Sequence, residues 1–264
     1  MLPRPLLKEK KWVVGILNVT PDSFHDGGLY STTEAAITQG KSMISDGADV
    51  IDVGGESTRP GADHVSAEEE ARRILDVVSA LSSLAPVSID TTKPDVARAA
   101  LDAGATILND VRGLRDPAMM EISSDFDEVV LMHSRGTPQN MTTLTQYESI
   151  VEDIYRFFES QLSICKCNKI WLDPGIGFAK TASQSLTLIK RLPTFLSLGH
   201  PLYLGASRKS FIGKTLRLPK SADRLTGSLG AVAAGFYGGA TAFRVHDVRE
   251  TKQILDLLCA IQQS

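Results

Sequence analysis

The sequence predicts an α/β fold, a TIM-type (β/α)8 barrel that spans residues 1–264 as a single domain. Three observations favour this fold. The chain has 264 residues, and barrels of this class routinely use about 250 residues as one unit. Short β-rich runs alternate with longer amphipathic stretches along the whole chain. Polar residues gather where the β-rich runs end, which is the face on which barrel enzymes build their active sites.

Eight β-rich runs are the expected strands. They are Trp12–Leu17, Val50–Val53, Val87–Ile89, Thr106–Leu108, Val129–Met132, Ile170–Leu172, Leu202–Leu204 and Ala242–Val245. Eight amphipathic stretches follow them as the expected helices. They are Thr33–Asp46, Ala67–Leu84, Asp95–Ala103, Pro117–Ser124, Gln146–Ser163, Ala182–Leu196, Ala222–Tyr237 and Val248–Gln262. Because no linker separates the repeats, a closed barrel is favoured over an open sheet.

Three of the joints between a helix and the next strand share a Gly-Ala pair. These joints are DGADVIDV, AGATILND and GGATAFRV. Glycine adopts the left-handed conformation that ends a helix and returns the chain to the sheet. The three joints therefore form an internal repeat of supersecondary structure.

Composition limits the expected partners. The 28 basic and 31 acidic residues give a formal charge of -3, so the chain has no net positive charge that would attract nucleic acid. The N-terminal segment MLPRPLLKEKKW has no apolar run long enough for a signal or a membrane segment. Three cysteines, Cys165, Cys167 and Cys259, are expected to be reduced thiols of a cytoplasmic protein. Metal binding by Cys165 and Cys167 is disfavoured because no second pair or nearby histidine completes a ligand set.

Polar residues occur at or just past the expected strand ends, and they are Asn18, Asp52, Asp90, Asn109, His133, Asp173, Ser207 and Arg244. Asp90 and Asp173 each follow an apolar strand, so their carboxylates are expected to point into the barrel mouth. Each could instead cap a helix or stabilise a turn. Together with Asn109, they offer acceptors and donors for the edge of a nitrogen-rich heterocycle.

An anion site is indicated by the last strand. Arg244 and His246 alternate in FRVHDV and therefore share one face, while Asn18 ends the first strand, which neighbours the last in a closed barrel. An arginine fork, an imidazole and an amide can together hold a diphosphate. The alternatives are a structural salt bridge for Arg244 and an ordinary rim position for His246.

The segment GASRKSFIG carries a third group of polar residues. Lys209 is placed to reach across the barrel mouth as a donor, and Arg208 and Ser210 are placed to meet a carboxylate. The alternative is a solvated basic turn. The spacing of the glycines and of the Lys-Ser pair excludes a Walker loop.

Two long loops, NVTPDSFHDGGLYS and GGESTRPGADHVS, follow the first and second strands. Long loops in a compact barrel usually bind ligands or act as lids. Phe24, Asp26, Thr58 and Arg59 lie on these loops and suit a charged, aromatic substrate. The alternative is that they are flexible loop tips.

Taken in order, these segments resemble the signature motifs of the pterin-binding enzyme family, and within it of the dihydropteroate synthases. The motifs are LNVTPDSF with DGG, GGESTRPGA, SIDT, ILNDV, LMH, LDPGIGF, GASRKSFIG and FRVHDV, and they cover nearly the whole chain. Some of them are shared with pterin-binding methyltransferases. SRKSFIG and RVHDV together favour the synthases.

The resemblance implies a role for each matching residue. It implies that Asp90, Asn109, Asp173 and Lys209 hold the pterin, with Met132 in its stacking wall. It implies that Asn18, Arg244 and His246 hold pyrophosphate with a magnesium ion, with Asn18 as a metal ligand and with help from Asp26, Thr58 and Arg59. It implies a p-aminobenzoate slot lined by Phe24, Pro60, Phe178, Lys209 and Ser210.

The resemblance also implies an activity. The expected enzyme is a cytoplasmic, homodimeric transferase of folate biosynthesis and a sulfonamide target. It would join p-aminobenzoate to 7,8-dihydropterin-6-ylmethyl diphosphate by a dissociative displacement and release pyrophosphate. Two alternatives remain, a methyltransferase domain that passes a methyl group to a corrinoid partner and a paralogue that binds pterin without catalysis.

Overall fold

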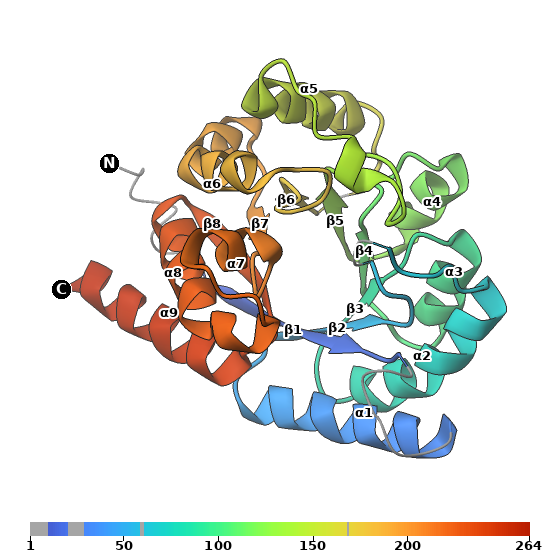
Figure 1. Ribbon diagram of the computed structural model, residues 1–264. Helices are drawn as coiled ribbons and strands as arrows, with labels where there is room; N and C mark the ends of the chain where they lie inside the picture. Colours follow the sequence, from blue (N-terminus) through green and yellow to red (C-terminus); the bar gives the residue numbers. More distant parts are fainter. Residues whose placement is uncertain (1–9, 21–28, 59–60, 168) are drawn as a thin grey trace.

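The predicted barrel is confirmed. The computed structural model describes residues 10–20, 29–58, 61–167 and 169–264. Eight parallel strands pair in chain order from β1 to β8, and β8 pairs with β1 to close the barrel. The helices form an outer ring around the strands (Figure 1).

The strands lie close to their predicted positions. They are β1 (Trp12–Asn18), β2 (Val50–Gly54), β3 (Val87–Asp90), β4 (Ile107–Asp110), β5 (Glu128–Met132), β6 (Ile170–Asp173), β7 (Leu202–Leu204) and β8 (Ala240–Val245). β1, β2, β3, β4 and β6 continue past their predicted C-terminal ends. The ladder of backbone hydrogen bonds does not depend on side-chain polarity, so Asn18, Asp90, Asn109 and Asp173 belong to the strands themselves.

The helices of the described residues are α1 (Leu29–Ser45), α2 (Ala67–Ser82), α3 (Pro94–Asp102), α4 (Pro117–Ile122), α5 (Ile150–Leu162), α6 (Ala182–Lys190), α7 (Ser210–Leu216), α8 (Leu225–Tyr237) and α9 (Val248–Gln263). Short 3-10 turns are η3 (Ser123–Asp125), η4 (Met141–Thr143), η5 (Leu192–Leu198) and η6 (Ser221–Arg224). None of the helices in the described ranges is long and apolar enough to cross a membrane.

Four predicted helices have a boundary that is wrong by three or more residues, and one of them is the helix expected from Thr33, which begins at Leu29. The helix expected over 182–196 ends at Lys190, because Pro193 lacks the N–H that would continue it, and η5 follows. The helix expected from Gln146 begins only at Ile150. The helix expected from Ala222 is first a 3-10 turn and becomes α8 at Leu225.

The core has two layers because successive side chains of a strand point to opposite faces. The outer layer packs the strands against the helices and contains large buried rings such as Phe158, Phe195 and Phe243. The inner layer fills the barrel and consists of Val14, Val50, Ile107, Val130, Tyr203 and Ala242. This inner layer separates the two ends of the barrel.

One glycine lets the loop after β6 pass directly over the end of β5. Gly175 has a φ of +68°, and a Cβ placed on it would lie 1.9 Å from the carbonyl oxygen of His133. Only a residue without a side chain fits both the left-handed backbone and the close approach. The loop that carries Asp173 and Phe178 is positioned by this contact.

We predict that Gly175→Ala lowers the free energy of unfolding more than Gly199→Ala does. Gly199 has a similar φ of +77°, but a Cβ placed on it would meet no atom within 4 Å. Gly199→Ala should therefore cost only the left-handed backbone penalty of about 1–2 kcal/mol. Gly175→Ala must also displace the backbone of His133, just after β5. Urea unfolding of the two variants measures the difference, and equal losses would contradict the role of the close approach.

Candidate active site

The C-terminal mouth of the barrel is organised around Arg244 of β8. Its Nε donates to Oδ2 of Asp52 at 2.6 Å, and its Nη2 donates to Oδ2 of Asp90 at 2.7 Å. Both carboxylates are buried, and the arginine side chain is 18% exposed. Arg244 therefore forms structural salt bridges, which the sequence left open as the alternative to binding an anion. Its Nη1 makes no hydrogen bond within the described residues, so both N–H groups of this nitrogen remain for a ligand.

The two carboxylates and the guanidinium shift one another's pKa. Burial alone would lower the pKa of Arg244, but Asp52 and Asp90 raise it above its ordinary value. Burial raises the pKa of Asp90, although Arg244 opposes this change. The second oxygen of Asp90, Oδ1, is buried without a hydrogen-bond partner among the described residues. A buried acceptor in this state is completed by a donor from a ligand or from water.

Asp52 is the support of this network, and the sequence analysis assigned it no role. It lies within β2 rather than at its end, and it is fully buried. Besides Arg244, it accepts a hydrogen bond from Ser88 Oγ at 2.5 Å and one from Asn109 Nδ2 at 3.2 Å. The available signal was a carboxylate inside the apolar run VIDVG, which requires buried partners.

A second group of polar atoms surrounds Gly205, just after β7. A Cβ on Gly205 would lie 3.5 Å from Asp173 Oδ2, 3.7 Å from Lys209 Nζ and 3.9 Å from Arg244 Cβ. Asp173 Oδ1 accepts the backbone N–H of Gly175 at 2.7 Å. Burial raises the pKa of Asp173, opposed by Lys209. Three predicted site residues therefore border one space.

Lys209 lies over the loop that follows β6. Its Nζ donates to the carbonyl oxygen of Ile176 at 2.6 Å and lies 4.7 Å from the centre of the Phe178 ring. Burial lowers the pKa of Lys209 to about 8, although the Asp173 carboxylate favours its charged form. The ammonium is thus held between an acidic group and an aromatic ring.

The residues expected to hold a pterin lie on neighbouring strands. Asp90 of β3 pairs in register with Asn109 of β4, and Met132 of β5 pairs with Asp173 of β6. Met132 is buried. The structure therefore brings acceptors, an amide and a thioether together around the same mouth, as a flat polar heterocycle requires.

The remaining predicted residues lie around this group. Asn18 ends β1 beside Gly54, and Thr58 is half-buried in the loop after β2. His246 follows β8, with its Nδ1 3.0 Å from Ser207 Oγ, and Ser210 is exposed at the start of α7. Arg208 does not remain available for a ligand carboxylate, because it forms a two-pronged ion pair with Asp247. The predicted residues Phe24, Asp26, Arg59 and Pro60 lie outside the described residues.

The described residues contain no group of three or more histidine, cysteine, aspartate or glutamate side chains that could hold a metal ion. Asn18, the expected metal ligand, is the last residue of β1, and its side chain carries one amide oxygen. Magnesium in enzymes is commonly held by one or two side chains together with water and substrate phosphates. The donor set therefore fits a magnesium ion that is bound through a diphosphate rather than in a protein cage.

Lys180 is a buried residue that the sequence analysis missed. Its Nζ lies 3.1 Å from His133 Nδ1, and it donates to the carbonyl oxygens of His133 at 3.2 Å and Phe178 at 2.9 Å. Burial lowers the pKa of Lys180, and burial together with the nearby Lys180 charge lowers the pKa of His133 to about 2. Lys180 thus ties the loop carrying Phe178 to the end of β5.

We predict that Lys180→Met lowers the free energy of unfolding by about 1–3 kcal/mol, because buried carbonyl oxygens lose their donor. Lys41→Met on the exposed surface of α1 is the matched control and should have little effect. Denaturant titration compares the two variants. A loss for Lys180→Met no greater than for Lys41→Met would show that this lysine does not hold the loop.

Comparison with known proteins identifies the family. The profile described as pterin binding enzyme matches residues 14–246. The dihydropteroate synthase of Synechocystis sp. is 44% identical over 262 residues, which cover 96% of this chain and 91% of that protein. A Clostridium difficile dihydropteroate synthase crystallised with pteroic acid has a TM-score of 0.90 at 41% identity, covering 97% of this chain and 98% of that one. The Xanthomonas albilineans enzyme with 4-aminobenzoic acid has a TM-score of 0.91 at 39% identity, covering 98% and 95%. The chain therefore belongs to the pterin binding enzymes, and within them to the dihydropteroate synthases.

Proposed function

We propose that this chain, acting as one domain, joins p-aminobenzoate to 7,8-dihydropterin-6-ylmethyl diphosphate. The bond between the pterin methylene carbon and the diphosphate oxygen breaks, a bond to the arylamine nitrogen forms, and that nitrogen loses a proton. The products are 7,8-dihydropteroate and pyrophosphate. The observation that carries the proposal is the set of buried Asp90, Asn109 and Asp173 with half-buried Lys209 beside Arg244. The ligands of the two structural relatives, pteroic acid and 4-aminobenzoic acid, support it.

The pterin would lie against Asp90, Asn109, Asp173 and Lys209. Asp90 Oδ1 lacks a partner among the described residues and would accept a ring or amino N–H. Asp173 Oδ2, which borders the space at Gly205, would accept a second. Lys209 and Asn109 would serve as donors, and Met132 would pack against the ring. These acceptors and donors match the alternating edge of a pterin.

The diphosphate would lie on the β1 and β8 side of the mouth. Arg244 Nη1, His246, Asn18 and Thr58 would hold it, with Asp26 and Arg59 from outside the described residues. Arg244 is already paired with two carboxylates, so it brings little net positive charge. A diphosphate therefore needs a further cation, which favours magnesium with Asn18 as a protein ligand. When bound, magnesium would offset the negative charge that develops on the leaving diphosphate.

The reaction would follow a dissociative course. As the diphosphate departs, positive charge develops on the pterin, and the Asp90 and Asp173 carboxylates would stabilise it. The p-aminobenzoate would enter beside Phe178, with Lys209 and Ser210 near its carboxylate and with Phe24 and Pro60 completing the slot. Exclusion of water by these groups would leave the weakly basic arylamine as the nucleophile.

Two further properties belong to this proposal. A cytoplasmic location is supported by Cys165, Cys167 and Cys259, which are all free thiols.

A homodimer is supported by the outer face of α9, where Leu257 is 60% exposed and Ile261 is 53% exposed one turn later. Two apolar side chains at this spacing form a stripe that a second copy of the chain could cover.

The function is tested by measuring pyrophosphate release with both substrates present. The proposed synthase releases pyrophosphate only when p-aminobenzoate is added with the pterin diphosphate and magnesium. A pterin-binding paralogue without activity binds the pterin but releases nothing. A methyltransferase domain also releases nothing, and instead binds a methylated folate.

We predict that Asp173→Asn weakens binding of a pterin analogue by about one to two decades, because the amide presents a donor to a ring N–H and leaves it unpaired, at about 1–3 kcal/mol. Pyrophosphate affinity should change less than twofold. His246→Ala is the comparison variant, with the opposite pattern. Calorimetry with each ligand separates the two ends of the site, and a pterin loss of less than twofold in Asp173→Asn would refute the assignment.

We predict that the Michaelis constant for p-aminobenzoate rises as pH increases above about 8. Burial lowers the pKa of Lys209 to about 8, so its ammonium is present below that pH and lost above it. The carboxylate of p-aminobenzoate stays ionised over this range, since carboxyl groups titrate near pH 4. Lys209→Arg retains its charge and should show a flat profile. Steady-state kinetics from pH 6.5 to about 9.5 tests this, and identical profiles for the two proteins would exclude Lys209 as the titrating group.

A further inference from the structure

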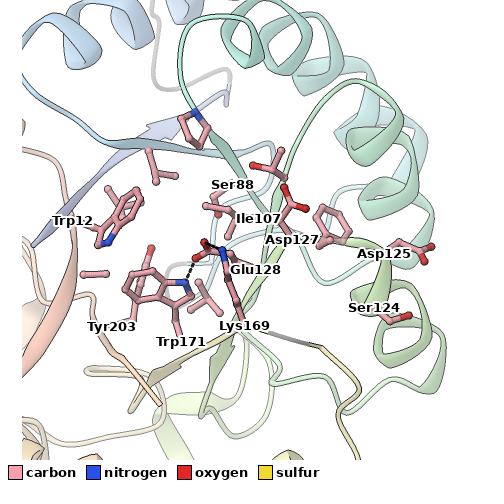
Figure 2. A pocket seen from close by; sticks show the side chains of 17 residues that line it. Trp12, Ser88, Ile107, Ser124, Asp125, Asp127, Glu128, Lys169, Trp171 and Tyr203 are labelled. Carbon is pink, nitrogen blue, oxygen red and sulfur yellow. Dashed lines mark hydrogen bonds and ion pairs between the residues drawn. The ribbon is translucent and has the colours of Figure 1, made fainter. Parts of the chain in front are cut away.

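The opposite end of the barrel also contains a cavity. We call it the N-terminal mouth, because its walls come from the first residues of the strands. Its volume is about 630 Å³, and its lining includes Trp12 of β1, Glu128 of β5, Trp171 of β6 and Tyr203 of β7 (Figure 2). Cavities of this size accommodate molecules of one or a few rings.

The N-terminal mouth is distinct from the site described above. Val14, Val50, Ile107, Val130 and Ala242 form the apolar layer between them. These side chains also line the cavity, so they are its inner wall. A molecule bound at the N-terminal mouth would therefore not occupy the space around Gly205.

Two indole rings form the aromatic part of the wall. Trp12 and Trp171 meet edge to face with their ring centres 6.1 Å apart, and Trp171 Nε1 donates a hydrogen bond to Glu128 (Figure 2). The ring of Trp12 already attracts a cation, because Lys10 Nζ lies 4.0 Å from its centre. Both tryptophans also line an adjoining cavity of about 490 Å³. The rings are thus accessible from two sides.

A buried hydroxyl on the same wall lacks a partner. Tyr203 is 3% exposed, and its hydroxyl makes no hydrogen bond within the described part of the chain. Tyrosine hydroxyls that are buried usually have a partner, because an unsatisfied one loses its hydrogen bond to water. The hydroxyl has almost no accessible surface, and the charges of Asp52 and Arg244 act on it, so Tyr203 forms the floor of the cavity rather than a ligand contact.

The rim of the N-terminal mouth is acidic. Asp125, Asp127 and Glu128 line it together with one basic residue, Lys169. Asp125 is paired with Arg98, and Glu128 lies 3.4 Å from the exposed Lys169. Asp127 makes no ion pair among the described residues. The balance of charge at the rim favours a cation over an anion.

We propose that the N-terminal mouth is a second ligand site, for a small, flat, positively charged aromatic molecule. The ring packs against Trp12 and Trp171, where a cation is favoured by the indole faces. The charged N–H group lies toward Glu128 and Asp127. This site is independent of the proposed synthase activity.

The two tryptophans make this site directly observable, because they are the only tryptophans of the chain and both line the cavity. The probe is benzamidine, and benzoate is the control of similar shape and opposite charge. Benzamidine should quench tryptophan emission saturably, with an affinity at least tenfold above that of benzoate. Linear quenching, or equal affinity for benzoate, would overturn the proposal.

Variants locate the bound probe. Glu128→Gln should weaken benzamidine binding at least threefold, whereas Glu159→Gln on the exposed surface of α5 should leave it unchanged. Asp127→Asn at the exposed rim should weaken binding at least twofold. This variant tests the acidic rim if Glu128→Gln fails to fold. Unchanged binding in the folded variants would overturn the proposal. Displacement of benzamidine by pteroic acid would also overturn it, because the probe would then lie at the C-terminal mouth.

Discussion

The buried ion network of Arg244, Asp52 and Asp90 is the interaction on which the C-terminal mouth depends. It joins β8 to β2 and β3 across the barrel interior. A buried charge is tolerated only when it is paired and hydrogen-bonded. Ser88 and Asn109 complete the pairing of Asp52, and the conformation of each of these side chains is thereby restricted. The residues proposed to bind substrate therefore rest on groups that need not touch it.

Two hydrogen-bonding groups of the network have no partner among the described residues. Arg244 retains Nη1, and Asp90 retains a buried acceptor without a partner among the described residues. Burial also raises the pKa of Asp173 and lowers that of Lys209, which shows that desolvation of these groups opposes their charged forms before any ligand binds. Perturbed groups that converge on one space are typical of functional sites, because a ligand with matching donors and acceptors offsets the cost of their burial.

The same strands carry different chemistry at their two ends. Alternate residues face the barrel interior, so β6 places Trp171 near one end and Asp173 near the other, and β8 likewise places Ala242 below Arg244. Between these ends lies the apolar layer, and Ser88, which donates a hydrogen bond to Asp52, also lines the N-terminal mouth. A closed barrel can therefore hold an aromatic, acidic cavity beneath a polar catalytic one.

The sequence by itself determined the barrel, the order of its strands and the candidate set of Asp90, Asn109 and Asp173, because strand periodicity and strand ends are local features of the chain. It placed helix boundaries less well, as the early end of α6 before Pro193 shows. Only the tertiary structure decided that Asp52 supports the site and that Lys180 joins His133 to the Phe178 loop. Arg244 and Asp52 are 192 positions apart, and their contact exists only because the closed barrel brings β8 and β2 to the two sides of β1.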